Sequence, residues 1–444
     1  MVLLLLLWVL MVPSFSYSFE NIFGFQDDKE ESIKHFPLMA EMGVKWVRTY
    51  IYWSDVEPTR EDPPKYHWKK YDELFKRLLE ARFTPIVIIA GNPTWISTYP
   101  GGPFDKGDAK DYLRFVEALV ERYNGDGKND APGSPKILYW EIYNEPDLTS
   151  LEYAQYPIWG FWGNEPVKYA DLLKAIYPVI KKACPDAQVV FGGIAFDHWS
   201  AFNSKFLEEV LKAGGGKYFD IMNFHYYYPF HSVWERYGPD IIGKTNYIKS
   251  RLASYGMRKE IFCTETGHWS GEQSSLEFQA SYLTKLFIRG MAADLKSMIW
   301  FILVDSDTKG TDSTRGLLDT KLNKKPSYYA LNHLISYMRG TVFRQPILSV
   351  AEGGDIAVDW DLTERIKYKL SPHSVLEGYS FYQPDLKKDI FILWSNSREF
   401  TVRFFGKSIQ VYDQYGKKKA VAPSNGNPLS IKLYSNPIFL EKQK

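Results

Sequence analysis

The stretch that decides the fold is "KILYWEIYNEPDL" (136–148). Its apolar, β-favouring run at 137–140 is typical of a strand buried on both faces. The run then gives way to Asn144-Glu145-Pro146, an amide and a carboxylate followed by a residue that lacks a backbone N–H. We therefore expect a buried strand that ends by presenting two polar side chains.

Strand-like and helix-like segments alternate on both sides of this stretch. The expected strands are 21–26, 44–50, 84–91, 136–142, 187–193, 219–229, 260–267 and 297–305. The expected helices are 28–43, 71–82, 108–123, 166–183, 204–213, 241–255, 274–295 and 326–338. Eight strand–helix pairs over about 320 residues predict an α/β protein with a (β/α)8 barrel.

The composition changes after Gly340. Segments such as "FILWSNSREFTVRFFG" (391–406) read as short strands separated by Gly, Asn and Pro, without helical periodicity. We expect a barrel over 19–340 followed by a small β-sandwich domain over 341–444.

The N-terminus, "MVLLLLLWVLMVPSFSYS" (1–18), resembles a secretory signal peptide, with an apolar run and small residues at its end. No Lys or Arg precedes the run, so an uncleaved anchor is a weaker alternative. Signal cleavage would place the protein outside the cell with no stable membrane partner. The formal net charge of +1 gives no reason to expect a nucleic-acid partner. Two cysteines exclude a disulfide scaffold, and Cys263 is expected to be a buried thiol.

Barrel enzymes carry their active sites at the carboxyl ends of the strands, which is where Glu145 falls. A second carboxylate, Glu265, ends the strand "EIFCTETG" (260–267). A retaining glycosidase needs two such groups about 5–5.5 Å apart. Glu141 lies deeper in its strand, and we expect it to form an ion pair inside the barrel, with Arg48 as one possible partner.

The tripeptide Asn-Glu-Pro occurs again at 164–166, but there it follows no strand. We expect Asn164 to cap the next helix and Pro166 to begin it. Glu165 is therefore not a candidate catalytic residue.

"WEIYNEP" (140–146) and "CTETG" (263–267) resemble the clan of retaining (β/α)8 glycoside hydrolases that have catalytic glutamates on strands 4 and 7. This clan includes cellulases, xylanases, mannanases and β-xylosidases. The resemblance covers about 21–340 and extends to "VRTYIYWSDVEP" (47–58), "GNPTW" (91–95) and "HYYYP" (225–229). "VYDQYG" and "NPIFLE" also resemble the β-sandwich that often follows these barrels.

The resemblance implies roles for four polar residues around the cleaved bond. Glu145 would be the general acid/base and Glu265 the nucleophile. Asn144 would bond the sugar 2-hydroxyl, and Arg48 would keep the nucleophile ionised. Two like charges that close together push one pKa up, so one group holds a proton while the other stays ionised.

The resemblance implies supporting roles for four further residues. Tyr227 would orient the nucleophile, and His225 would line the acid/base side. Trp300 would be the platform under the sugar, and Trp95 would stack against the substrate.

The prediction is a secreted retaining β-glycoside hydrolase acting on an oligo- or polysaccharide without a cofactor. Endo action is favoured because aromatic loops spread over several strand ends. An exo-acting enzyme such as a β-xylosidase is the alternative, and it requires the loops 149–163 and 305–316 to close one end of the cleft. A non-catalytic carbohydrate-binding barrel is a second alternative.

No metal is expected at the catalytic site. The segment 305–316 opens like an EF-hand but lacks the closing Glu, so a substrate-side loop is favoured there. A calcium ion at 124–133 is a minor alternative to a polar turn.

Overall fold

The computed structural model describes residues 21–26, 30–196, 201–271, 274–306, 311–349, 356–358, 376–397, 399–404, 409–421 and 429–443. The expected signal segment 1–18 lies outside these ranges. Within them, no helix is both long enough and apolar enough to cross a bilayer.

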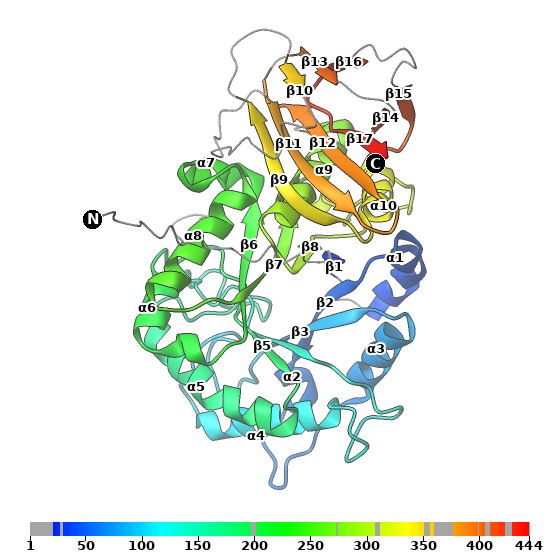
Figure 1. Cartoon of the computed structure of the whole chain (residues 1–444). Coiled ribbons are helices and arrows are strands. Elements are labelled where there is room, and N and C mark those ends of the chain that lie inside the picture. The colour runs from blue at the N-terminus through cyan, green and yellow to red at the C-terminus, as the bar shows by residue number, and fades with distance from the viewer. Residues whose placement is uncertain are drawn as a thin grey trace, which may run out of the picture.

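Eight parallel strands close into a barrel in sequence order, with β8 paired to β1 (Figure 1). They are β1 (Phe23–Gln26), β2 (Trp46–Tyr52), β3 (Thr84–Ala90), β4 (Tyr139–Ile142), β5 (Gln188–Val190), β6 (Ile221–Tyr227), β7 (Glu260–Gly267) and β8 (Ser297–Trp300). The predicted (β/α)8 barrel is confirmed. The last strand is shorter than expected because its pairing with the neighbouring strands ends at Trp300.

Helices surround the barrel on its outside. They are α1 (Phe36–Met42), α2 (Trp53–Val56), α3 (Lys69–Glu80), α4 (Ala109–Arg122), α5 (Pro166–Ala183), α6 (Phe206–Lys212), α7 (His231–Trp234), α8 (Ile241–Ser254), α9 (Leu276–Ala292) and α10 (Pro326–Met338). Short 3-10 turns lie between them, at η1 (Glu30–His35), η2 (Gly215–Lys217), η3 (Tyr228–Phe230), η4 (Glu235–Tyr237) and η5 (Thr311–Thr314).

The N-terminal regions of α1 and α5 differ from the prediction in an informative way. The segment expected as one helix over 28–43 is η1 followed by α1, because Pro37 has no N–H to extend a preceding helix and stands in the first turn of a new one. Pro166 begins α5 as expected, but the N-cap residue is Glu165, whose side chain makes no capping bond. Asn164 instead donates to the carbonyl of Thr149, at 3.5 Å.

Apolar side chains fill the lower barrel, below the ends that carry the polar groups. This inner layer comprises Trp46, Ile86, Val190, Ile221, Phe262 and Ile299. A Cβ on Gly24 would lie 2.3 Å from Ile299 Cδ1 and 2.7 Å from Trp46 Cβ, so β1 passes this layer only as glycine. The barrel is therefore closed at this level, and a ligand can approach only from the opposite end.

The C-terminal region contains two sheets. A six-stranded antiparallel sheet has the order β15-β14-β17-β12-β11-β9, and a three-stranded sheet has the order β10-β13-β16. The strands are β9 (Val342–Ser349), β10 (Ile356–Val358), β11 (Leu376–Gln383), β12 (Lys388–Ser395), β13 (Phe400–Phe404), β14 (Ile409–Asp413), β15 (Lys418–Val421), β16 (Leu429–Leu433) and β17 (Ile438–Gln443). One apolar cluster draws side chains from both sheets, among them Leu393, Val402, Leu433 and Leu440.

The C-terminal strands pack beside α9 and α10 on one side of the barrel (Figure 1). A buried ion pair joins the two parts: Arg289 on α9 donates to both carboxylate oxygens of Glu377 on β11, at 2.8 and 2.7 Å. Arg289 also contacts Asp240, which precedes α8. Burial alone would raise the pKa of Glu377, but the charge of Arg289 outweighs it and the pKa is lowered.

Removing the shared cation is expected to be severely destabilising. Arg289→Met leaves Glu377 and Asp240 buried without their counter-ion, which costs about 3–5 kcal/mol of unfolding free energy. Urea unfolding followed by circular dichroism measures this change. Arg77→Met, which removes an exposed Arg77–Glu73 pair on α3, is the matched control; its expected cost is below about 1 kcal/mol. Equal costs for the two variants would contradict this account of the interface.

Candidate active site

Arg48 connects the polar side chains at the carboxyl ends of the strands. It lies on β2, is fully buried, and donates to Glu141 Oε2 and Oε1 at 2.9 and 2.7 Å. The same guanidinium donates to Asn144 Oδ1 at 2.6 Å, Gln26 Oε1 at 3.1 Å and Glu265 Oε2 at 3.3 Å. Side chains from β1, β2, β7 and the β4 end are thus fixed by one planar group.

The buried ion pair between Arg48 and Glu141, suggested from the sequence, is present. Burial by itself lowers the pKa of Arg48, but the charge and hydrogen bonds of Glu141 outweigh it and the pKa is raised. The guanidinium therefore stays charged beside Glu265. Glu141 also accepts a hydrogen bond from the backbone N–H of Gly193, at 3.1 Å.

Glu145 is held in a strained backbone conformation directly after β4. Tyr143 and Glu145 have φ of 59° and 45°, in the left-handed region that side-chain-bearing residues rarely occupy. Their backbone N–H groups donate to the carbonyls of Ile89 and Gly193, at 3.2 and 3.1 Å. The neighbouring strands thus fix the turn that carries the carboxylate.

A bulge brings Glu265 to the same place. Side chains along β7 point alternately to the two faces of the sheet, and the Thr264 hydroxyl accepts a hydrogen bond from Asn223 Nδ2 on β6. The next side chain would normally face the opposite way. The pairing with β6 and with β8 shifts register at this point, which re-aims Glu265 toward Arg48 and Tyr227.

The two glutamates lie close together with different partners. Tyr227 donates to Glu265 Oε1 at 2.6 Å, while His225 Nδ1 lies 2.8 Å from Glu145 Oε1 and 3.8 Å from Glu265 Oε2. One oxygen of each carboxylate and one His225 nitrogen all fall within 4.8 Å of one another. Burial, followed by the charge of Glu265, raises the pKa of Tyr227, so its hydroxyl stays protonated and donating.

His225 is a neutral imidazole at neutral pH. Burial is the main cause that lowers its pKa to about 4, and the Arg48 charge adds to this effect. Its ring packs against Gly193, where a Cβ would lie 2.2 Å from Nε2, so the segment that follows β5 must have glycine at this position. A neutral ring at this place exchanges hydrogen bonds with Glu145 without adding charge.

The residues Glu145, His225 and Glu265 also have the donor types that a metal takes. The arrangement fits a metal poorly, because Tyr227 and the cationic Arg48 already donate to both oxygens of Glu265. The donor set favours a carboxylate pair that flanks a reacting bond.

Asn144 is placed between Arg48 and the loop that follows β4. Its Oδ1 accepts from Arg48, and its Nδ2 donates to the carbonyl of Ile158 at 2.9 Å. One Nδ2 hydrogen is left for a substrate hydroxyl, so the predicted contact with a sugar 2-hydroxyl remains a prediction.

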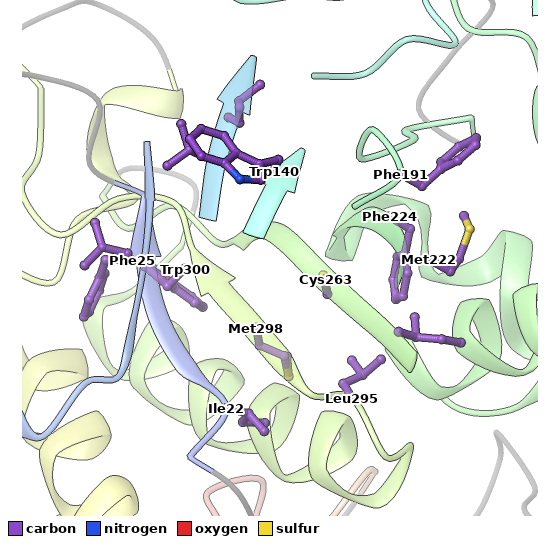
Figure 2. Packing of buried hydrophobic residues seen from close by; sticks show 14 of the residues in the cluster. Ile22, Phe25, Trp140, Phe191, Met222, Phe224, Cys263, Leu295, Met298 and Trp300 are labelled. Atoms are coloured by element: carbon purple, nitrogen blue, oxygen red, sulfur yellow. The ribbon is translucent and has the colours of Figure 1, made fainter. Parts of the chain in front are cut away.

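The structure contradicts the prediction that Trp300 is the sugar platform. Figure 2 shows Trp300 among buried apolar residues beside Phe25, and it is fully buried. Side chains on β8 alternate, so Ile299 faces the barrel interior and Trp300 faces the helices. The next residue, Phe301, is partly exposed and lies 5.9 Å from Arg315, whose guanidinium stacks 4.4 Å over Tyr227.

Trp95 lies in the loop after β3 and is partly exposed. Its indole donates to the carbonyl of Glu57 at 3.2 Å, and its ring packs edge-on against Trp53 at 5.1 Å. These contacts fix the ring but do not connect it to the carboxylate pair. Its stacking role stays a prediction.

Sequence reasoning missed three residues of this region: Gln26, Phe301 and Arg315. Gln26 had a usable signal, since it is the polar end of an otherwise apolar strand in "NIFGFQ". Arg315 had none, because it reaches Tyr227 from a loop about 90 residues further along the chain.

Comparisons with known proteins agree with this geometry at the level of the fold. No protein-family model matches the chain. Aryl-phospho-beta-D-glucosidase BglH of Bacillus subtilis (strain 168) is 30% identical over 112 residues, which are 24% of this chain and 22% of that protein. The match thus spans about a fifth of that relative.

Solved structures match over nearly the whole chain. A family 39 glycoside hydrolase from Bacteroides cellulosilyticus WH2 has a TM-score of 0.68 and 20% identity, covering 94% of this chain and 80% of that one. A glucosidase from Croceicoccus marinus has a TM-score of 0.63 and 13% identity, covering 96% of each chain. At these identities the likeness concerns the fold, the (β/α)8 barrel with its C-terminal strands described above.

The neutral His225 makes folding sensitive to acid. The pKa of His225 is about 4 in the folded protein and about 6.5 in the unfolded chain. Below about pH 6.5 the unfolded chain therefore binds a proton at His225 that the folded protein does not bind. Stability is therefore kept above this range and falls by about 1.4 kcal/mol per pH unit toward pH 4.

Between about pH 6.5 and 5, the free energy of unfolding of the parent should fall by about 2 kcal/mol because of His225, and His225→Gln should not show this part of the fall. Urea unfolding at a series of pH values measures this. His67→Gln, at an exposed histidine, is the matched control and should keep the acid dependence of the parent. An unchanged slope in His225→Gln would show that His225 is not the group responsible.

Proposed function

We propose that this protein is a retaining β-glycoside hydrolase with Glu145 as general acid/base and Glu265 as nucleophile. One observation carries the proposal: two carboxylates approach within 4.8 Å on opposite sides of the barrel mouth, and each has different partners. This spacing suits direct attack, whereas an inverting pair lies about 6.5–9.5 Å apart to admit a water.

The partners of each glutamate suit the two steps. Arg48 and Tyr227 stabilise Glu265 as an anion, which attacks the anomeric carbon while Glu145 gives its proton to the departing oxygen. The sugar is then joined to Glu265 as an ester. Glu145, now a carboxylate beside His225, takes a proton from water; the hydroxide adds to the anomeric carbon, and Glu265 leaves.

The substrate class proposed is a β-linked oligo- or polysaccharide, and the place of action is outside the cell. The first rests on the resemblance of residues 140–146 and 263–267 to retaining (β/α)8 glycoside hydrolases, and the second on the sequence of residues 1–18. We also propose that the two C-terminal sheets form a sandwich, because one apolar cluster takes side chains from both. A non-catalytic binding barrel would not need the two differently supported carboxylates.

The loop after β4 favours the exo alternative over the endo action expected from the sequence. Strands β4 and β7 divide the barrel mouth into two arcs, and an internal cut requires both arcs to be open. Residues 149–163 cross from the end of β4 toward the ends of β2 and β3. The Ile158 carbonyl accepts from Tyr50 on β2 at 3.4 Å, and Phe161 N–H donates to the Gly101 carbonyl at 2.8 Å.

Close backbone contacts hold this loop down. A Cβ on Gly160 would lie 2.8 Å from the Asn144 carbonyl oxygen, and one on Gly101 would lie 1.8 Å from the carbonyl oxygen of Trp159. Trp162 N–H donates to the Pro146 carbonyl at 2.9 Å. The loop is thus a fixed wall over one arc, as a pocket for a chain end requires.

The two glutamate roles predict different substrate dependence. Glu265→Ala is expected to abolish hydrolysis of every substrate. Glu145→Ala should slow oligosaccharide hydrolysis by about 10²–10⁴-fold and aryl β-glycosides with good leaving groups far less, because these need little protonation. Steady-state rates on both substrate types measure this, and proton NMR should show the β-anomer appearing first.

The second Asn-Glu-Pro copy supplies the control. Glu165→Gln, at the start of α5, should keep activity within about twofold of the parent, since the Glu165 carboxylate pairs with Lys168 on the surface. If folded Glu165→Gln lost as much activity as Glu145→Gln, the assignment of the acid/base to Glu145 would be wrong.

Exo action predicts the product pattern. With β-linked oligosaccharides labelled at the reducing end, single sugar units should accumulate from the first minutes, while labelled chains shorten one unit at a time. Chromatography of timed samples distinguishes this from internal cutting. Early products of intermediate length would restore the endo prediction.

A further inference from the structure

A cavity lies between the barrel and the C-terminal strands, and neither Glu145 nor Glu265 lines it. Its volume is about 400 Å³, within the range of small-molecule sites. One wall is the face of α9 that carries Phe278, Tyr282, Lys285 and Arg289, at helical spacing. The opposite wall is formed by the ends of the C-terminal strands, through Ser395, Asn396, Ser435 and Asn436.

Two polar groups on the α9 wall lack partners. Across the described ranges, the Lys285 ammonium makes no hydrogen bond or ion pair, and its recorded contact is with the Trp394 ring at 5.7 Å. Tyr282 is 4% exposed, and its buried hydroxyl has no hydrogen-bond partner in the described structure. A buried hydroxyl is normally satisfied, so the Tyr282 hydroxyl indicates a polar ligand, and the partly exposed Lys285 ammonium lies one turn further along the same helix face.

Neighbouring charges do not satisfy Lys285. Arg289 uses its guanidinium on Glu377 and Asp240. Glu277, the other acid on the cavity wall, accepts from Gln414 and Asn436, each at 2.8 Å, and from Tyr415 at 2.5 Å. An anion entering the cavity would therefore meet one uncommitted cation.

Aromatic rings form the third element of this site. Tyr228 packs against Tyr282 at 5.2 Å and against Phe278 at 6.0 Å, and Phe278 is 42% exposed. Such rings bind the flat apolar face of a pyranose, while the hydroxyl and amide groups opposite suit its hydroxyls.

We propose that this cavity binds an acidic sugar, a pyranose ring bearing a carboxylate. The carboxylate pairs with Lys285, the Tyr282 hydroxyl bonds the same ligand, and Tyr228 and Phe278 contact its ring. The site is separate from the catalytic pair and does not depend on the proposed hydrolysis.

Isothermal titration of the full chain with D-glucuronate, D-glucose and acetate tests this. Glucuronate should bind at least about tenfold more tightly than glucose, which lacks the carboxylate, or acetate, which lacks the ring. Lys285→Met should weaken glucuronate binding at least about tenfold, and Tyr282→Phe about threefold. Equal affinity for the three probes, or an unchanged affinity in folded Lys285→Met, overturns the proposal.

Two further arms locate the ligand and its charge partner. Glu145→Gln should bind glucuronate as the parent does, and loss of binding there would place the ligand in the catalytic site instead. Lys285→Arg keeps the positive charge and should still bind glucuronate. Equal loss of glucuronate affinity in Lys285→Met and Lys285→Arg would contradict the proposed ion pair.

The pH dependence gives an independent readout. Burial, then the charge of Arg289, lowers the pKa of Lys285 to about 8, while Glu377 and Asp240 oppose this. The binding form is the protonated one, so affinity should fall as pH rises above about 8. Affinity that is constant to about pH 10 would contradict a lysine contact.

Discussion

The buried guanidinium of Arg48 is the constraint on which the mouth of the barrel depends. A full positive charge without access to water is costly, and here it is offset by five hydrogen bonds to four side chains. Two of those acceptors are the carboxylates of Glu141, which is fully buried, and Glu265, which is 15% exposed. The charges therefore stabilise one another, and the positions of the strands that carry them are fixed together.

Arg48 also explains why the two candidate catalytic carboxylates are not equivalent. Glu265 lies beside a permanent cation and accepts from Tyr227, so its environment favours the anion. Glu145 instead faces a neutral histidine. Two residues further on lies Asp147, which is fully buried; burial and then the charge of Glu145 raise its pKa. The same barrel mouth thus surrounds the two carboxylates with different partners, which is what the proposed division of roles requires.

The sequence predicted those features that depend on local pattern. Alternating apolar segments predicted the eight strand–helix pairs, strand-end positions predicted Glu145 and Glu265, and the family resemblance implied Arg48. The repeated Asn-Glu-Pro was separated correctly, because only one copy follows a strand. The error at Trp300 has a different origin: aromatic type and position near a strand end do not decide on which side of β8 a ring falls. The alternation places Ile299 in the inner layer of the barrel and Trp300 in the core outside it.

Tertiary packing decides what the sequence could not show. A register shift in β7 directs Glu265 inward, although strict alternation after Thr264 would turn it away. The course of residues 149–163 depends on glycine contacts with segments far along the chain, which no periodicity reveals. The same holds for the interface between α9 and the C-terminal strands.

The ion-pair cluster at that interface has a consequence for how the molecule can be divided. Asp240, bound by Arg289, immediately precedes α8, and α8 carries Lys244, whose ammonium donates to the backbone carbonyl of His225 at 2.7 Å. Arg289 thus links β11 to the residue before α8, and α8 is in turn hydrogen-bonded to β6, the strand that carries His225. The barrel and the later strands therefore share one buried charge cluster. Cutting the chain near Gly340 would remove Glu377 and leave Arg289 with Asp240 as its remaining ion-pair partner among the described residues.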